Sequence, residues 1–448
     1  HLREVNTMNL LFILTDNQRA DLMGCSGNPI IQTPNLDQLA ETGVRFSNAF
    51  ATTPICAASR ASYLTGLYER RHQFTFLTPP MRREFTAVSY PEILKSNGYR
   101  TGIIGKFGIA SNGVPPTVEG GEDTLGRMFD HFDNFEWTDK GYEVKQPDGS
   151  IRHLTDVTGE KAVAFIEDHA GQETQPFCLS VSFNAPHAQA GDPRHYIWPD
   201  EESDLYVDDV IPQPANADPA FFEALPEFIR NSESRVRWHT RFDTEENYQR
   251  NMRGLYRMVS GVDRNVGRML DALDHHGLRE STIIIFASDH GMYYGDRGLS
   301  DCWQMNEENL RVPLIVNDPR TTVRGQVRDE MALNIDVAPT ILDLCGYSTP
   351  STTQGRSLRP LLEDAETDWR SSFFCEHLFD RHDIPKSEGV RTEGWKYIRY
   401  FEQSPIHEQL YELSTDPTES HNLVSEIRFA EKLDEMRVLC DDLKQRSA

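Results

Sequence analysis

The sequence predicts an α/β fold, in which a large, mostly parallel central sheet is flanked by helices and a smaller antiparallel sheet with one helix follows. Three observations support this prediction. Short apolar runs alternate with helical patterns, each of these runs ends in polar residues, and the pattern becomes shorter after residue 355. The 448 residues suffice for one large and one smaller part, which we predict as residues 1–355 and 356–448.

Four apolar runs predict strands of the large sheet, at residues 9–14, 98–104, 177–183 and 283–288. Continuous apolar runs are typical of strands that are buried on both faces. The polar residues that follow these runs include Asp16, Asn17, Lys106, His187, Asp289 and His290. Because ligands of a parallel α/β sheet bind outside the carboxyl ends of its strands, we expect all four ends to face one site.

Helical patterns lie between these runs, at residues 36–41, 90–97 and 252–275. The last of them has apolar residues at helical spacing, which is typical of an amphipathic helix. Residues 186–244 are polar, contain several prolines and are weakly periodic, so we predict long loops near the cleft.

The C-terminal part is patterned differently. Residues 346–355 resemble a linker or a long loop. Apolar runs at residues 373–377 and 395–400 then predict a small antiparallel sheet, and we expect a final helix from about residue 426.

The composition excludes several classes of protein. A formal net charge of −25 argues against nucleic acid and anionic membranes as partners, since phosphates require a basic surface. A small anionic substrate remains compatible, because a local cluster of basic residues and metal can invert the field inside a cleft. The seven cysteines are widely spaced and form no CxxC pair, which excludes a disulfide framework or a zinc ribbon.

The sequence contains no apolar stretch that is long enough to span a bilayer and no signal-peptide pattern. We therefore expect a cytoplasmic protein, or a periplasmic or secreted one if a signal peptide has been removed.

Cys56 is the candidate nucleophile. A lone cysteine is usually a buried structural residue. This one follows Thr52, Thr53 and Pro54 and opens a predicted helix, and a helix N-terminus lowers the pKa of a thiol and favours anions. Arg60 lies one helical turn further along and faces the same way. The pattern indicates an anion site with a nucleophile at its base.

Cys56 belongs to the first of several sequence motifs along the chain. Residues 56–60 read C-A-A-S-R and are followed by L-T-G at 64–66. Further segments are T-P-N-L-D-Q-L-A at 33–40, G-Y-R-T-G-I-I-G-K at 98–106, D-V-A-P-T at 336–340 and L-Y-E-L at 410–413. In this order and spacing they resemble the sulfatase family of the alkaline phosphatase-like superfamily, and the resemblance covers nearly the whole chain.

The resemblance implies a specific chemistry. In the family a maturation enzyme converts the motif cysteine, here Cys56, to formylglycine, whose aldehyde forms a hydrate. One hydroxyl attacks the sulfur and expels the alcohol, and loss of a proton from the other lets the adduct eject sulfate. The expected substrate is therefore a small sulfate monoester, such as a sulfated sugar or an aryl sulfate, and a homo-oligomer is compatible with the sequence.

The resemblance also implies the groups around this nucleophile. The metal site would consist of Asp16, Asn17, Cys56, Asp289 and His290. Their oxygen-rich character suits Ca²⁺, with Mg²⁺ or Mn²⁺ as alternatives.

Three basic residues match catalytic positions of the family. Arg60 and Lys106 would hold the formylglycine and supply positive charge to the oxyanion. His187 would contact the sulfate and protonate the leaving oxygen.

The sequence departs from the family pattern at four positions. Asn17 stands where the family has a second acid, and His290 where an asparagine is common. Gly108 replaces a usual histidine, and Cys302 stands where a lysine is expected. Arg297 or His290 could substitute for the missing groups. Residues that could line the substrate pocket are Arg297, Cys302, His195, Tyr196, Trp198, Glu376, His377 and Arg381.

Two alternative functions are compatible with the sequence. Phosphonate monoesters and phosphodiesters share the tetrahedral geometry of sulfate esters, so a hydrolase of those substrates could use the same fold, cysteine and metal. The second alternative is a catalytically inactive anion-binding homologue, in which Cys56 stays a thiol.

Overall fold

A computed structural model describes residues 7–76, 78–109, 118–134, 141–171 and 175–448. Its central sheet has eight strands in the order β13-β2-β12-β9-β1-β8-β4-β5. They are β13 (Gln326–Arg328), β2 (Val44–Phe46), β12 (Leu314–Asn317), β9 (Thr282–Ser288), β1 (Asn9–Thr15), β8 (Phe177–Ser182), β4 (Arg100–Gly105) and β5 (His131–Asn134). Of these, β12 alone runs against its neighbours. The predicted mostly parallel sheet is therefore confirmed, and all four predicted strands belong to it.

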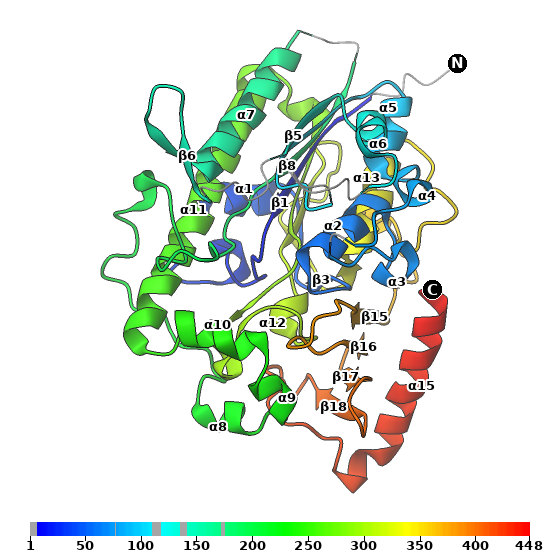
Figure 1. Ribbon diagram of the computed structural model, residues 1–448. Helices are drawn as coiled ribbons and strands as arrows, with labels where there is room; N and C mark the ends of the chain where they lie inside the picture. The colour runs from blue at the N-terminus through cyan, green and yellow to red at the C-terminus, as the bar shows by residue number, and fades with distance from the viewer. Residues whose placement is uncertain (1–6, 77, 110–117, 135–140, 172–174) are drawn as a thin grey trace.

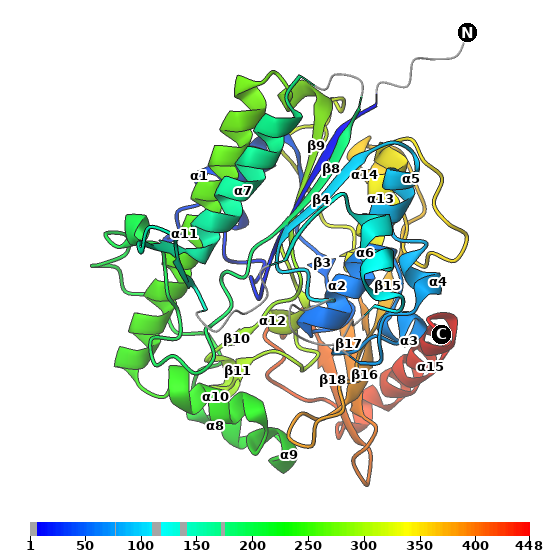
Figure 2. The ribbon, with the colours of Figure 1, turned by 45° about the horizontal axis from the view of Figure 1, so that its top comes forward.

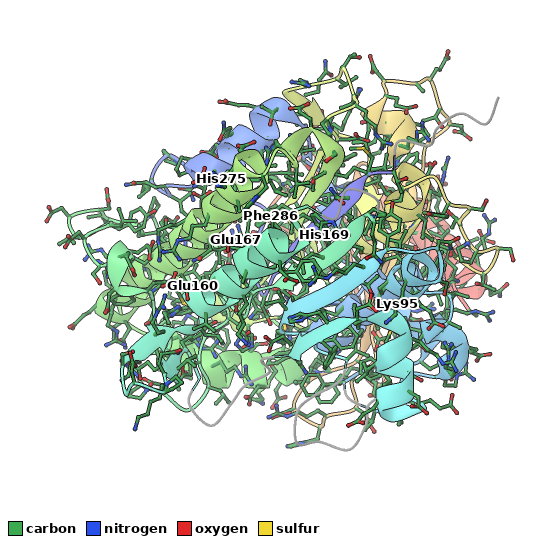
Figure 3. The ribbon with its side chains drawn as sticks, turned by 90° about the horizontal axis from the view of Figure 1, so that it is seen from above. Lys95, Glu160, Glu167, His169, His275 and Phe286 are labelled. Atoms are coloured by element: carbon green, nitrogen blue, oxygen red, sulfur yellow. The ribbon has the colours of Figure 1, made fainter. Side chains whose placement is uncertain are left out.

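Helices cover both faces of this sheet. Leu11 and Ile13 of β1 pack against α1 (Pro34–Thr42), α7 (Leu154–His169) and α11 (Glu245–His275). Leu10 and Phe12 point to the opposite face, where α2 (Cys56–Thr65), α5 (Tyr90–Ser96) and α13 (Val337–Leu344) lie. Figure 2 shows the two layers on either side of the strands, and in the view from above α7 and α11 lie side by side (Figure 3). The side chains of a central strand thus have apolar partners on both sides, as its continuous apolar run predicts.

The strand register aligns the polar ends. Leu14 of β1 lies opposite Ser182 of β8 and Ala287 of β9. Gly105 of β4 also pairs with Ser182. The residues that follow these four strands therefore emerge at one level of one edge of the sheet.

Part of the stretch predicted as loops is helical. The short helices are α8 (Pro219–Glu223), α9 (Glu227–Arg230) and α10 (Glu233–Arg241). Local capping explains α8, since the Asp218 side chain accepts a hydrogen bond from the Ala220 N–H and Pro219 occupies the first turn. The side chain of Thr244 likewise caps α11 and starts it at Glu245, earlier than its apolar pattern predicts.

The C-terminal part forms the predicted antiparallel sheet with one helix. Its strands are β15 (Ser372–His377), β16 (Ser387–Thr392), β17 (Trp395–Tyr400) and β18 (His407–Glu412), and α15 (Ala430–Arg446) packs on one face. The other face contacts the large domain through Phe50 and Phe373, whose ring centroids lie 4.9 Å apart. In Figure 1 the small sheet lies at the end of the large sheet that is remote from the N-terminus. The predicted boundary at residue 355 stays a prediction.

Further elements complete the description. These are α3 (Glu69–His72), α4 (Arg83–Thr86), α6 (Gly121–Met128), α12 (Glu307–Leu310), α14 (Arg359–Leu362), β3 (Ala49–Phe50), β6 (Glu143–Lys145), β7 (Ile151–His153), β10 (Tyr293–Tyr294), β11 (Ser300–Asp301) and β14 (Ala332–Leu333). Within the described ranges, no helix is both long and apolar enough to cross a membrane.

A buried carboxyl group at the junction of the two sheets predicts a pH-dependent stability. Glu69 is 1% exposed and accepts a hydrogen bond of 2.7 Å from the Thr53 hydroxyl. Burial, and next the negative charge of Glu376, raise the pKa of Glu69 from 4.5 to about 8. The folded state thus holds this proton more tightly than the unfolded state, so the stabilisation is present below pH 4.5 and is lost as the pH rises to about 8.

We therefore expect Glu69→Gln to raise the melting temperature at pH 8.5 by about 5 °C and to change it little at pH 5. Differential scanning calorimetry at both pH values measures this. Equal shifts at the two pH values would show that the carboxyl proton is not the cause.

Candidate active site

The ends of four strands converge, as expected from the sequence. The backbone N–H of Asp289 donates to the Thr15 carbonyl over 3.0 Å, and that of Asp16 donates to the Ala185 carbonyl over 3.2 Å. The Lys106 ammonium group donates to Oδ2 of Asp16. The ends of β1, β4, β8 and β9 are thus joined directly.

The residues Asp16, Asn17, Asp289 and His290 fit a divalent cation. Asp16, Asp289 and His290 are buried, and each offers a ligand atom within 4.8 Å of the others. Oδ1 of Asp16 and Oδ1 of Asn17 are buried and lack a hydrogen-bond partner among the described residues. Because an unsatisfied buried oxygen is costly, two of them beside further carboxylate oxygen indicate a cation site.

The backbone of Asn17 is part of this arrangement. Its φ of 68° lies in the left-handed region, which asparagine tolerates better than most residues. Its N–H donates to Oδ1 of Asp289 over 3.1 Å, and its carbonyl accepts a hydrogen bond of 2.6 Å from the Tyr294 hydroxyl. This turn leaves the amide oxygen available to a cation.

His290 presents one nitrogen to the same place. Its Nδ1 lies 2.8 Å from the Gly291 carbonyl oxygen, and its Nε2 lies 3.8 Å from Oδ1 of Asp289. Burial alone would lower the pKa of His290, but Asp289 and Cys56 raise it to about 9. The imidazole therefore lies in a strongly negative environment, and the same environment would stabilise a bound cation.

Cys56 is the first residue of α2 and is half-buried. Arg60, one turn along, points to the strand ends. Its Nε donates to Oδ2 of Asp289 over 2.9 Å, and its Nη1 donates to the Lys106 carbonyl over 2.7 Å and to the Ser182 hydroxyl over 2.5 Å. The arginine thus ties the helix that carries Cys56 to the candidate metal residues.

Two buried cations lie next to Cys56. Burial disfavours the charged form of Arg60, but Asp289 and Asp16 raise its pKa above the ordinary value. Burial likewise opposes the charge of Lys106, and Asp16 and Cys56 raise its pKa. Both groups stay protonated, so they supply fixed positive charge for an oxyanion.

His187 lies in the loop after β8 and is half-buried. Its Nδ1 lies 2.7 Å from the Ala188 carbonyl oxygen. Burial lowers the pKa of His187, and the charge of Asp16 partly offsets this effect. A histidine held in this way suits proton transfer near neutral pH.

The structure explains the glycine at position 108. Gly108 has φ +78°, and a Cβ atom at this residue would lie 2.4 Å from Cδ of Arg60. Any side chain there, the histidine of the family included, would therefore collide with the arginine in its present position.

We expect Gly108→Ala to displace Arg60 and to lower kcat by about 100-fold, because small displacements of positioning groups have effects of that order. Steady-state kinetics with a sulfate ester measures this. The matched control is Gly98→Ala, because Gly98 has φ +91° but a Cβ atom added there would meet no other atom within 4 Å. Both variants carry the same backbone strain, about 1 kcal/mol, so equal losses of kcat would contradict the role of the Arg60 contact.

Other predicted pocket residues lie in several places. Cys302 is buried beside Ile55 and Ala58, and burial raises its pKa well above the ordinary value, so it supplies no charge like that of a lysine. Arg297 does not join the strand-end group, because its guanidinium donates to Glu308 over 3.0 Å and to the Thr418 carbonyl.

The remaining predicted side chains come from two regions. Nε2 of His195 lies 2.9 Å from the Thr240 carbonyl oxygen, and Arg381 pairs with Asp383 and, at 3.3 Å, with Glu233. His377 is fully buried at the end of β15, and neither ring nitrogen has a hydrogen-bond partner among the described residues. Burial, and next the charge of His290, lower the pKa of His377 to about 3.

Some residues of the site could not be predicted from the sequence. Ser59 donates from its hydroxyl to the Asp289 carbonyl over 2.5 Å, and Asn334 donates to that hydroxyl over 3.0 Å. Ser182 binds Arg60 from within a strand. Ser59 could have been found from its place inside the C-A-A-S-R motif. No sequence pattern distinguishes Ser182 or Asn334 from other polar residues.

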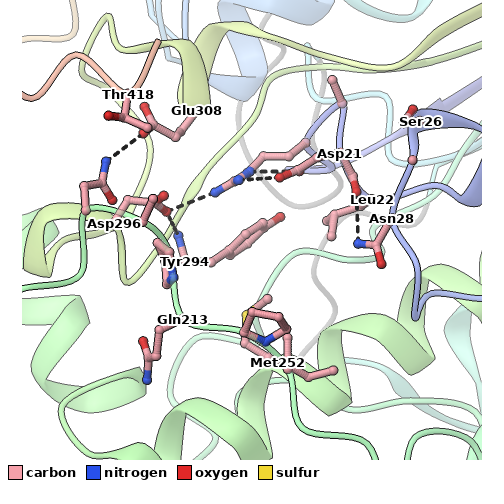
Figure 4. Close-up of a pocket in the computed structure, with 18 of the residues that line it drawn as sticks. Asp21, Leu22, Ser26, Asn28, Gln213, Met252, Tyr294, Asp296, Glu308 and Thr418 are labelled. Carbon is pink, nitrogen blue, oxygen red and sulfur yellow. Dashed lines mark hydrogen bonds and ion pairs between the residues drawn. The ribbon is translucent and has the colours of Figure 1, made fainter. Parts of the chain in front are cut away.

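A separate cavity of about 490 Å³ is lined by Asp21, Tyr294 and Asp296, among other residues (Figure 4). Tyr294, which binds the Asn17 carbonyl, is part of its wall. Arg19 pairs there with Asp21 and, at 3.0 Å, with Asp296. None of the predicted catalytic residues lines this cavity.

Two family profiles match this chain. The profile of the Sulfatase family matches residues 8–347. A second profile, described as N-sulphoglucosamine sulphohydrolase, C-terminal, matches residues 295–446.

Individual relatives are similar over almost the full length. An N-acetylglucosamine-6-O-sulfatase of Bacteroides thetaiotaomicron is 27% identical, over 99% of this chain and 87% of that protein. The multifunctional alkaline phosphatase superfamily protein PehA of Trinickia caryophylli is 28% identical, over 94% of this chain and 92% of its own.

A solved structure shows the same fold. It is a protein in complex with its substrate D-glucosamine-2-N,6-O-disulfate, with a TM-score of 0.80 and 25% identity over 98% of both chains. The Sulfatase profile matches most of the chain, and the relatives match almost all of it. This chain therefore belongs to the sulfatase family and is a sulfuric ester hydrolase.

Proposed function

We propose that this sulfatase hydrolyses a sulfate monoester of a sugar or related alcohol, with Cys56 matured to formylglycine and Ca²⁺ as its cation. One observation carries the proposal. The half-buried Cys56 opens a helix whose Arg60 binds Asp289, beside a buried group of potential cation ligands and the ammonium group of Lys106. The relative named N-acetylglucosamine-6-O-sulfatase and the neighbour bound to a sulfated glucosamine support a sugar sulfate.

The cation would be held by oxygen atoms of Asp16, Asn17 and Asp289 and by Nε2 of His290. When bound, it supplies a Lewis acid that polarises a sulfate oxygen. Three oxygen donors favour Ca²⁺ and keep Mg²⁺ and Mn²⁺ as alternatives, whereas the imidazole is an unusual ligand for a hard cation.

The residues of the chain supply the remaining functions. An aldehyde at position 56 would provide, as its hydrate, the hydroxyl that attacks sulfur. Lys106 and Arg60 hold positive charge beside it, which stabilises oxyanions. Nε2 of His187 is the candidate donor of the proton to the leaving oxygen. The proposal requires a formylglycine-generating maturation enzyme as a partner.

A phosphonate monoesterase or phosphodiesterase is the second candidate. The observations that favour it are the cysteine in place of a lysine at position 302 and the name multifunctional given to the relative PehA.

Side-by-side assays separate the two functions. The enzyme would be produced together with a maturation enzyme and tested with 4-nitrophenyl sulfate, a 4-nitrophenyl phosphonate monoester and bis(4-nitrophenyl) phosphate. We expect the highest kcat/KM for the sulfate. A kcat/KM that is tenfold higher for the phosphonate or the diester would favour the second candidate instead.

A further inference from the structure

Two arginines and an aspartate form an ion-pair cluster near the segment that precedes Cys56. We call Arg237, Arg241 and Asp301 the double-arginine cluster. Both arginines belong to α10, which packs on β11, the strand that contains Asp301. Asp301 pairs across to Tyr293 of β10, shortly after His290 in the chain. The cluster is therefore anchored to the same chain segment as the candidate metal site.

The turn after β11 holds the cluster against the segment that precedes Cys56. Asp301 and Trp303 have φ values of 72° and 85°, which cost side-chain-bearing residues roughly 1 kcal/mol or more each. The Trp303 N–H donates to the Pro54 carbonyl over 3.2 Å, and Cys302 packs on Ile55 and Ala58. Such strained positions cluster at functional sites, since only surrounding contacts maintain them.

The cluster has more donors than acceptors. Oδ2 of Asp301 accepts from Nη1 of both arginines, from Arg241 over 3.0 Å. Arg237 also binds Glu233 through Nε over 2.9 Å. Arg241 uses Nη1 alone, for Asp301 and Ser300, and its buried Nε has no hydrogen-bond partner among the described residues. The Nε edge of a guanidinium is one of the two forks that bind an oxyanion through two N–H groups.

A hydroxyl group adds to this surplus. Tyr196 is 1% exposed, and its hydroxyl has no hydrogen-bond partner within the described part of the chain. Tyr196 follows His195, whose Nε2 lies 2.9 Å from the carbonyl oxygen of Thr240, the residue before Arg241. The Gln189 N–H, two residues after His187, donates to the His195 carbonyl over 2.7 Å, so the His187 loop is joined to the segment that carries Tyr196. The cluster thus lies on the His187 side, where the leaving alcohol would lie.

We propose that Arg241, with Arg237 and the Tyr196 hydroxyl, forms a subsite for a second oxyanion on the alcohol part of the substrate. This inference rests on the proposed function. Unpaired buried donors are costly, and a carboxylate or a second sulfate would satisfy them. The substrate class is therefore a sulfated sugar that carries a further carboxylate or sulfate, in preference to a singly charged sulfate ester.

The test compares substrates on the matured, metal-loaded enzyme. The singly charged substrate is N-acetylglucosamine 6-sulfate. The doubly charged ones are N-sulfoglucosamine 6-sulfate and a sulfated uronic acid, and they distinguish a sulfate from a carboxylate. We expect kcat/KM to be at least tenfold higher for one doubly charged sugar, mainly through KM. Arg241→Lys, which keeps the charge but loses the fork, should reduce that ratio at least tenfold.

Tyr196→Phe is a milder variant, which removes one hydroxyl and should reduce the same ratio by about threefold even if Arg241→Lys does not fold. The control is Arg235→Lys on the same helix, because Arg235 stacks on Phe222 and Trp238 and should leave the ratio unchanged. Equal kcat/KM for singly and doubly charged sugars, or a ratio unchanged in both test variants, would overturn the subsite while leaving the sulfatase proposal intact. Failure of the wild-type enzyme to cleave any sulfate ester would overturn both.

Discussion

Replacement of Cys56 by serine should abolish turnover while sulfate esters still bind. Serine keeps the size of the side chain but, without a maturation route for serine, yields no aldehyde. We expect kcat/KM to fall by at least about 10⁴-fold, the order seen when an enzyme loses its nucleophile. Binding should persist, because Arg60, Lys106 and the residues of the candidate metal site hold each other in place without Cys56.

Three measurements check this prediction. Steady-state kinetics gives the loss of turnover, and calorimetric titration with a sugar sulfate gives the dissociation constant. Mass spectrometry of the tryptic peptide that contains residue 56 shows whether wild-type protein carries an aldehyde there. Cys25→Ser is the matched control, because Cys25 is another half-buried thiol and hydrogen-bonds through its backbone to Asp37, away from the strand ends.

The outcomes separate the alternatives raised by the sequence. Full activity of protein in which residue 56 is entirely a thiol would rule out the formylglycine mechanism. Wild-type-like turnover of Cys56→Ser would remove the nucleophilic role altogether. An anion-binding protein without catalysis would bind the ester equally well in both forms and hydrolyse it in neither.

The convergence of Asp16, Lys106, His187 and Asp289 could be predicted because parallel strands end at the same edge of a sheet. Apolar runs locate the strands, and the residues that follow them are then placed within one turn. The small antiparallel sheet was predictable from its short runs in the same way. Its final helix starts at Ala430 rather than near residue 426, since residues 427–429 form a 3₁₀ turn.

The rest depends on contacts between segments that no periodicity relates. The collision that excludes a side chain at Gly108 can be seen only in the folded structure. There the Arg60 side chain lies against Gly108 and donates a hydrogen bond to Asp289. The position of α10 over β11 depends on Asp301, whose carboxylate pairs with both arginines from a strained turn. Stretches rich in proline and polar residues give little information on such packing, which is why residues 186–244 were predicted as loops alone.

Asn17 distinguishes this site from a site with two adjacent acids, and it predicts a direction. Each additional carboxylate strengthens a Ca²⁺ site of this kind. Asn17→Asp would place a charge where a neutral oxygen now has no hydrogen-bond partner within the described ranges, so Ca²⁺ should bind more tightly to this variant than to the wild-type protein. This expected increase in Ca²⁺ affinity can be compared with the loss of affinity expected when the neighbouring Asp16 is changed to asparagine.

Asp16→Asn should abolish the stabilisation of the fold by Ca²⁺ together with nearly all activity. Oδ1 of Asp16 is a buried carboxylate oxygen without a hydrogen-bond partner among the described residues, and the negative charge also holds Lys106. At a concentration 100-fold above its Kd, a ligand stabilises the native state by about 2.7 kcal/mol, which corresponds to a melting temperature several degrees higher. We expect that shift in wild-type protein after chelation and addition of Ca²⁺, and none in Asp16→Asn.

The control must lose a buried carboxylate of similar structural weight. Asp263 is 2% exposed and accepts hydrogen bonds from the N–H groups of Asn35 and Leu36 at the start of α1, away from the strand ends. Asp263→Asn should melt at a lower temperature than the wild type and keep the full Ca²⁺ shift. If Asp16→Asn kept that shift, or if Asp263→Asn lost it, Ca²⁺ would bind elsewhere. The two unpartnered oxygens of Asp16 and Asn17 would then require another explanation.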